Sequence, residues 1–161
     1  MRNTFGKEIA KLAILDKRVY VLDGDLANST KIDKVHKLSP KKFIQAGIAE
    51  QNMVSMAAGM ATIGLQPWVV TFNSFLTKRA LDQIFVSVAQ TSLDVKLIGA
   101  YSGILNSSTG KTHQSLEDLA IMRAIPNMRI YAPADSYELK EVIRFANDYK
   151  GPVFIRLSRE S

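Results

Sequence analysis

The chain has 161 residues, which favours one domain spanning residues 1–161, and it contains no run of apolar residues long enough to span a bilayer. The absence of cysteine excludes disulfides, thiolate nucleophiles and cysteine metal sites, and it is typical of a cytoplasmic protein. The formal net charge is +6, but basic and acidic residues are interspersed, so we expect neither a nucleic-acid nor a membrane partner.

Short apolar, β-branched segments alternate along the chain with helical patterns. Ser136 stands where an N-cap is wanted at the start of the last expected helix, and the turn 150–152 ends that helix. The expected strands are 18–23, 43–45, 67–72, 95–101, 128–132 and 153–157, and the expected helices are 4–15, 49–64, 75–90, 115–124 and 136–149. This alternation predicts an α/β fold with a doubly wound, mainly parallel sheet flanked by helices.

In a sheet of this kind, ligands bind where the carboxyl ends of the strands meet. Segments 23–29, 47–50, 72–78 and 102–113 should therefore share one rim. The segment 102–110 reads SGILNSSTG, and its Gly, Ser, Asn and Thr content after a buried strand indicates a functional loop.

Glu50 opens an expected helix that is otherwise small and apolar. One interpretation is that an acid in the first turn simply complements the helix dipole. The other follows from Ala57, Ala58 and Gly59, which permit close backbone packing and would leave Glu50 next to a crowded interior. An acid so placed is a candidate for proton transfer.

Two further features have both functional and plain structural interpretations. Phe72 and Phe75 could form a wall for a flat ring, although aromatic residues at this spacing are more often core. His113 follows the flexible loop, where it could donate to a substrate oxygen or shuttle a proton, or be a surface histidine without a role. Dinucleotide, P-loop and serine-hydrolase motifs are absent, and the two histidines do not make a metal site.

The order of five motifs indicates a family. They are LDGDLANS, GIAEQNM, TFNSF with RALDQI, GKTHQSLEDLAIMRAIPNMRIYAPAD and GPVFIRLSR, and they cover nearly the whole chain. Together they resemble the pyrimidine-binding domain of transketolase, and most of all the small, C-terminal subunit of a split transketolase. That subunit normally carries a second domain after this one, so the sequence is expected to be either a truncated piece or an unusually short subunit.

The resemblance implies a transferase that uses thiamine diphosphate and Mg²⁺ to move a two-carbon ketol unit between sugar phosphates. The glutamate matching Glu50 hydrogen-bonds the aminopyrimidine of the cofactor and drives it toward the imino tautomer. Phe72 and Phe75 match the aromatic residues that flank the pyrimidine, and Asp25 matches an aspartate near the pocket. Lys78 lies where many members have another aromatic residue beside the ring.

The resemblance also implies a substrate site. His113 matches the histidine that touches the donor near its reacting carbonyl. Tyr101 replaces a histidine that helps to hold phosphate, and Thr109 replaces an aspartate that binds a donor hydroxyl, so an altered sugar is expected. Three residues fall where the family grips the sugar phosphate: Arg2, Ser29 and Arg159.

The diphosphate and Mg²⁺ would be held by a separate, larger transketolase subunit, because this sequence lacks a Gly-Asp-Gly…Asn signature. Family active sites form between a pyrimidine domain and the diphosphate domain of another subunit, so we expect a homodimer within a heterotetramer and no activity from this chain alone. Three alternatives stay open. They are a subunit like 1-deoxyxylulose-5-phosphate synthase, a subunit like the β chain of a 2-oxoacid dehydrogenase, and a catalytically silent binding module.

Overall fold

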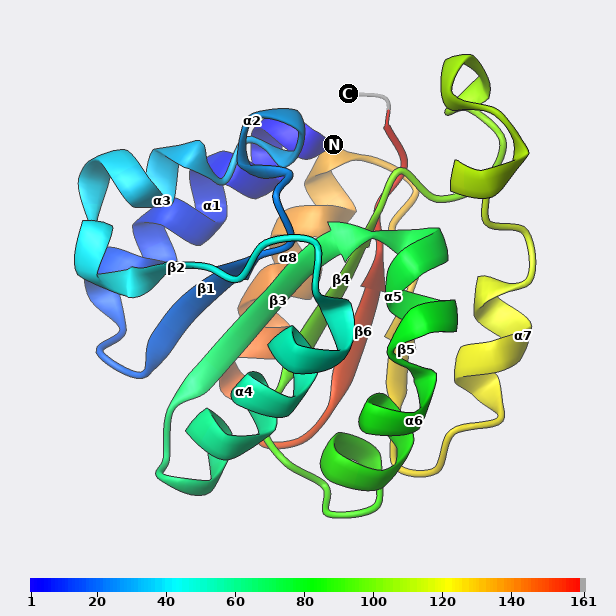
Figure 1. Cartoon of the computed structure of the whole chain (residues 1–161). Helices are drawn as coiled ribbons and strands as arrows, with labels where there is room; N and C mark the ends of the chain where they lie inside the picture. The colour runs from blue at the N-terminus through cyan, green and yellow to red at the C-terminus, as the bar shows by residue number, and fades with distance from the viewer. Residues whose placement is uncertain (160–161) are drawn as a thin grey trace.

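The computed structural model describes residues 1–159, apart from the side chain of Ser107. Within these residues one parallel sheet has six strands in the order β2-β1-β3-β4-β6-β5, and helices cover both of its faces (Figure 1). The strands are β1 (Val19–Asp23), β2 (Phe43–Gln45), β3 (Gln66–Phe72), β4 (Lys96–Ala100), β5 (Arg129–Tyr131) and β6 (Val153–Arg156). The predicted doubly wound α/β fold is confirmed.

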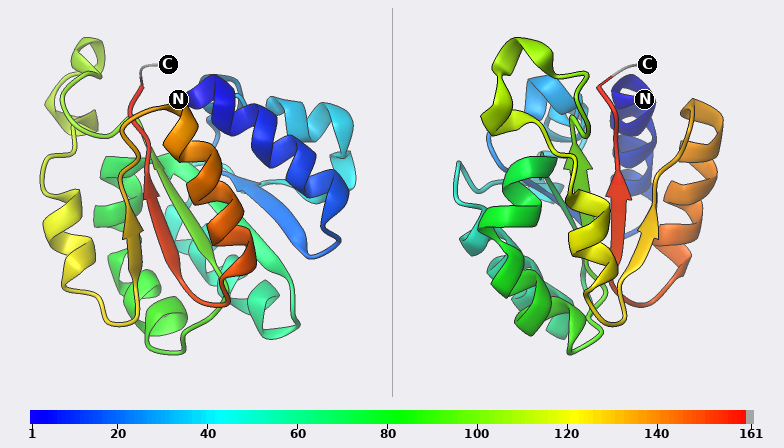
Figure 2. Two further views of the ribbon diagram at one scale, coloured as in Figure 1. Left: turned by 180° about the vertical axis from the view of Figure 1, so that it is seen from behind. Right: turned by 90° about the vertical axis from the view of Figure 1, so that its right-hand side faces the viewer.

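The helices form two layers, which Figure 2 shows from behind and from the side. One layer contains α1 (Arg2–Leu15), α3 (Asp33–Leu38) and α8 (Ser136–Asp148), and the other contains α4 (Glu50–Thr62), α5 (Asn73–Arg79), α6 (Leu81–Gln83), the π-helix η2 (Ile84–Ala89) and α7 (Asp118–Arg123). Short elements complete the list: α2 (Ala27–Thr30), η1 (Pro40–Lys42), η3 (Ser107–Thr109) and η4 (Lys111–His113). Across residues 1–159, none of the helices is long and apolar enough to cross a membrane.

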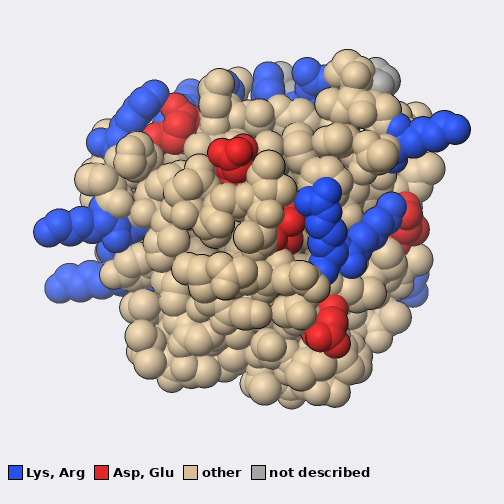
Figure 3. All heavy atoms as spheres, viewed as in Figure 1, with Lys and Arg blue, Asp and Glu red and all other residues tan. Residues whose placement is uncertain are grey.

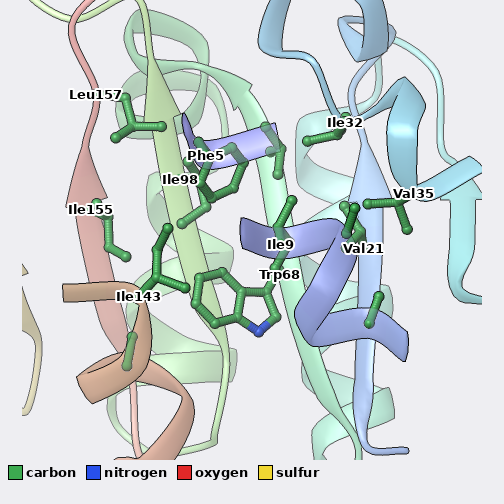
Figure 4. Packing of buried hydrophobic residues seen from close by; sticks show 14 of the residues in the cluster. Phe5, Ile9, Val21, Ile32, Val35, Trp68, Ile98, Ile143, Ile155 and Leu157 are labelled. Carbon is green, nitrogen blue, oxygen red and sulfur yellow. The ribbon is translucent and has the colours of Figure 1, made fainter. Parts of the chain in front are cut away.

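Each face of the sheet has its own hydrophobic core because successive strand residues point to opposite sides. Trp68 and Val70 of β3 join the core under α1 and α8, whereas Val69 joins the core under α4 and α5. Figure 4 shows Trp68 packed beneath Ile9 and close to Ile143. Burying an apolar side chain of this size contributes about 2 kcal/mol, so both layers hold the strands in place.

Besides shifts of one or two residues at helix ends, three features of the helices differ from the prediction. The N-cap of α8 is Asp135 and not Ser136, because the Asp135 carboxylate accepts hydrogen bonds from the backbone N–H groups of Tyr137 and Glu138 at 2.8 and 2.9 Å. The segment 75–90 is not one helix. It is divided into α5, α6 and η2, where backbone bonds reach the fifth residue.

The third difference lies before α7, which begins at Asp118 and not at residue 115. Ser115 instead forms an isolated antiparallel bridge with Gly103, and this bridge closes the base of the loop 103–115. The short helices α2 and α3 were not predicted, since four to six residues are too few to show a helical period.

Candidate active site

The carboxyl ends of the strands meet at one rim because all the strands are parallel. The chain runs from β1 to β2 on one side and later returns to place β3 on the other side of β1. Ligands in open α/β sheets bind at such a change of direction. The rim, at the top of Figure 1, also receives the N-terminal end of α1 and the loop 102–115.

An aromatic cluster stands at this rim. Phe72 ends β3, and its ring centroid lies 5.7 Å from that of Phe75 on α5 and 5.1 Å from that of Tyr101 after β4. The His113 ring lies 5.3 Å from Phe72 and 5.0 Å from Phe75, and all four contacts are edge-on. The structure therefore brings together four of the residues that the sequence singled out, although they come from three separate segments.

Glu50 is the first residue of α4, and only 3% of its surface is exposed. Its carboxylate oxygens lie 3.2 and 3.3 Å from Nη1 of Arg79, the last residue of α5. The Arg79 guanidinium carbon also stands 3.7 Å from the centroid of the Phe75 ring. Glu50 and Phe75 are thus linked by one planar cation beside an open cavity of about 580 Å³.

A second acid, Asp23, fixes the turn after β1 beneath the rim. Asp23 is fully buried at the end of β1, and burial raises the pKa of its carboxyl group. It accepts hydrogen bonds from the backbone N–H of Leu26, the backbone N–H of Ala27 and the side chain of Gln45. These bonds fix the turn in which Asp25 adopts a left-handed backbone with φ 68° and is exposed at the rim.

Tyr101, a member of the aromatic cluster, is also the centre of a cationic group at the rim. Arg2 donates a hydrogen bond to its hydroxyl at 2.8 Å, and that hydroxyl donates to the backbone carbonyl of Ser29 at 3.3 Å. The Arg159 guanidinium lies 5.5 Å from its ring centroid. Tyr101 has φ 59°, an uncommon conformation for a bulky residue and one that gathers at functional sites.

Lys78 and Thr109 have their contacts elsewhere. Lys78 forms an ion pair with Glu117 at 2.5 Å, and this hydrogen bond lowers the pKa of Glu117 to about 2. The Thr109 hydroxyl donates to the Asn106 carbonyl at 2.8 Å within the loop. The structure therefore does not join these two residues to the contacts between Glu50, Arg79 and Phe75.

Sequence reasoning missed two features of the site. Arg79 lies four residues after Phe75, and that spacing places two side chains on the same face of a helix, so the signal was present. The buried Asp118 accepts hydrogen bonds from Arg156 at 2.7 Å and from Asn73, which ties α7, β6 and α5 together below the loop 102–115. Within residues 1–159, no three His, Asp or Glu side chains cluster as metal ligands.

Residues 1–161 match the family model described as the pyrimidine binding domain of transketolase. The chain belongs to this family. It is 43% identical over 159 residues to a protein of Methanocaldococcus jannaschii described as a transketolase C-terminal section, which matches 99% of this chain and 50% of that protein.

Two further comparisons give the same assignment. A 6-deoxy-6-sulfo-D-fructose transketolase subunit of Clostridium sp. is 38% identical over 99% of this transketolase-family chain and 49% of its own length. The solved structure of a split-gene transketolase, an inactive β4 tetramer, superposes with a TM-score of 0.87 at 38% identity, over 99% of this chain and 51% of its own. The chain thus spans about half the length of the relatives it matches.

Proposed function

We propose that this chain is the pyrimidine-holding part of a cytoplasmic, thiamine diphosphate-dependent transketolase that moves a two-carbon ketol unit between sugar phosphates. The observation that supports this most strongly is that Arg79 bridges a buried carboxylate, Glu50, and the ring of Phe75. Family membership supports the reaction type, and the geometry supports the choice of residues.

The donor set fits an aminopyrimidine. Such a ring has a flat face that stacks on an aromatic side chain and a ring nitrogen that shares a proton with a carboxyl group. Arg79 is also planar and carries N–H groups, and it already contacts both Glu50 and the Phe75 ring. A flat, nitrogen-bearing ring therefore finds complementary chemistry at the same two side chains.

Thiamine diphosphate, when bound, supplies the carbanion chemistry of ketol transfer. Glu50 holds a proton at the ring nitrogen, and its burial excludes the water that would compete for that proton. Phe75 and Phe72 fix the plane of the ring. His113, in edge-on contact with both phenyl rings, provides a nitrogen for the carbonyl oxygen of the donor.

The Tyr101 group supports a site for the anionic end of the sugar. Arg2 and Arg159 converge on Tyr101 from the two ends of the chain, and charge-assisted donors of this kind bind phosphate or another tetrahedral anion. Asp25 and Ser29 follow β1 at the same rim. Thr109 lies in the loop 102–115, and Lys78 pairs with Glu117 just after that loop. The tyrosine and the threonine are the basis for proposing a sugar that differs from the usual transketolase donor.

We further propose a larger partner chain that holds Mg²⁺ and the diphosphate, with two copies of each in a heterotetramer. Exposed apolar side chains beside the two ends of α4 and on η2 support a partner, and they include Ile48, Ile63, Phe85 and Val86. In Figure 3 the surface over α4 is mainly uncharged, while two basic side chains stand over α5 and an acidic side chain lies over α6. The relatives described as a C-terminal section and as a split-gene transketolase support a separate partner chain.

Reconstitution with a diphosphate-binding transketolase subunit tests the proposal. The assembled chains, given thiamine diphosphate and Mg²⁺, should transfer a two-carbon unit from a ketose phosphate, while neither chain does so alone. Glu50→Gln should lower the rate about 10³-fold, the size expected of an acid–base group. Release of CO₂ from pyruvate would favour the synthase alternative, and full activity of Glu50→Gln would contradict the role of Glu50.

A further inference from the structure

We infer that Arg79 is a placeholder for the aminopyrimidine ring: it occupies Glu50 and Phe75 in the free chain and must leave both when the cofactor enters. The inference rests on the proposed function and adds a residue to it. In the part of the chain that the structure describes, both hydrogen bonds of the Glu50 carboxylate come from Arg79. The same guanidinium covers the Phe75 ring.

The local sequence explains why one side chain can make both contacts. Phe75 and Arg79 are four residues apart on α5, so the guanidinium lies over the ring of the preceding turn. Glu50 approaches from the first turn of α4, and α4 packs against α5. A planar cation is suited to this position because it stacks on an aromatic face and donates in its own plane.

The pairing with Arg79 stabilises the buried Glu50 carboxylate in the free chain. A buried carboxylate without a partner is costly, and Arg79 compensates Glu50 until another group arrives. The bond is nonetheless easy to exchange. Both distances exceed 3.1 Å, and 48% of the Arg79 side chain is exposed to solvent.

The Arg79 side chain also has a second position available to it. It borders the cavity beside Glu50, and it borders a groove of about 630 Å³ on its other side. Asp82, three residues further along, lines that groove and offers a carboxylate. Rotation of the Arg79 side chain from Glu50 toward Asp82 would free the acid and the ring face together.

The first experiment measures the interaction between Glu50 and Arg79 in the free chain by a double-mutant cycle. Glu50→Gln, Arg79→Met and the double variant are unfolded with urea. Arg144 and Glu141 provide the matched control, since Arg144 Nη1 lies 3.1 Å from Glu141 Oε2 but both side chains are exposed. Coupling between Glu50 and Arg79 should change the unfolding equilibrium about tenfold, against about twofold or less for the control pair. Equal coupling in both pairs overturns the inference.

The second experiment measures cofactor binding to the assembled complex by calorimetry. Arg79→Met keeps an unbranched stem but lacks the guanidinium, so the cofactor has nothing to displace. Its dissociation constant for thiamine diphosphate with Mg²⁺ should fall about three- to tenfold, while Arg144→Met leaves the constant unchanged. Arg79→Lys should lie between Arg79→Met and the native chain, because it keeps the charge without the planar group.

The outcomes separate the two proposals. Native binding with equal or weaker binding by Arg79→Met overturns the placeholder role alone and makes Arg79 an ordinary cofactor contact. A complex in which the native chain and all variants fail to bind the cofactor overturns the proposed function, and the placeholder with it. Tighter binding by Arg79→Met together with strong coupling in the free chain supports both.

Discussion

Two buried charged residues lie at opposite ends of the sheet, and their surroundings differ. Lys96, at the amino end of β4, is fully buried and donates to the carbonyls of Tyr149 and Gly151 at 2.8 Å, with Asp94 at 2.5 Å. Glu50, at the carboxyl rim, has only the longer contacts to a half-exposed arginine.

The difference shows how this fold separates stability from function. Each donor of Lys96 has an acceptor, so the group holds the turn before β6 to the start of β4 and has no free capacity. Burial lowers the pKa of Lys96, and the hydrogen bond to Asp94 opposes that shift. Glu50 keeps a partner that can be replaced, as a binding group requires.

Lys96→Met should give the largest loss of stability. The substitution keeps the length of the side chain but leaves the Tyr149 and Gly151 carbonyls without the Lys96 donor and leaves Asp94 with Gln66 as its donor, at a cost of about 3 kcal/mol. The melting temperature should fall by roughly 10 °C in thermal denaturation. Glu50→Gln, measured alongside, should change it much less, and an equal fall in both variants would remove the distinction.

Tyr101→Phe tests whether the hydroxyl of Tyr101 contributes to binding the anionic substrate at the rim. The variant keeps the ring against Phe72 but removes the hydroxyl that receives the Arg2 hydrogen bond. We expect KM for the anionic substrate to rise about tenfold with kcat nearly unchanged. The reason is that the substitution removes a charge-assisted hydrogen bond that contributes to substrate binding and not to the chemical step. Steady-state kinetics of the assembled complex give both values, and an unchanged KM would place the anion elsewhere.

A smaller effect is expected from Asp16 at the end of α1. Hydrogen bonds from Arg18 lower the pKa of Asp16 from 3.8 to about 2. Because the folded pKa is the lower one, the pair stabilises the fold above pH 3.8, and this stabilisation disappears as the pH falls through 2. Arg18 is partly exposed, so the contribution is below about 1 kcal/mol. Urea unfolding of Asp16→Asn against the native chain should show a difference at pH 6 that vanishes at acid pH.

Much of the fold could be predicted from the sequence because its strands are short, apolar and separated by clear turns. All six expected strands are present, and each of their ends agrees with the prediction to within one residue. The error at Asp135 arose because two candidate caps are adjacent and only geometry decides which carboxylate or hydroxyl faces the free N–H groups. The π-helix was missed because apolar spacing does not reveal which carbonyl a backbone N–H selects.

The sequence singled out residues that the structure brings together, but it did not reveal their contacts. Glu50, Phe72, Phe75 and His113 were named from motifs, yet the sequence could not show that Arg79 stands between the acid and the ring. It also could not show that the buried Asp118 ties α7 to α5 and β6, since that depends on contacts between distant segments. Pairings of this kind follow from tertiary packing and not from local spacing.

We propose that Glu50 governs a proton on the pyrimidine ring of bound thiamine diphosphate. The most direct measurement is hydrogen–deuterium exchange at C2 of thiamine diphosphate bound to the assembled complex, followed by NMR in the native and Glu50→Gln forms. We expect fast exchange at C2 in the native complex, and exchange slowed by about 10²-fold or more in the Glu50→Gln complex with the cofactor still bound. Equal exchange rates in the two complexes would contradict it.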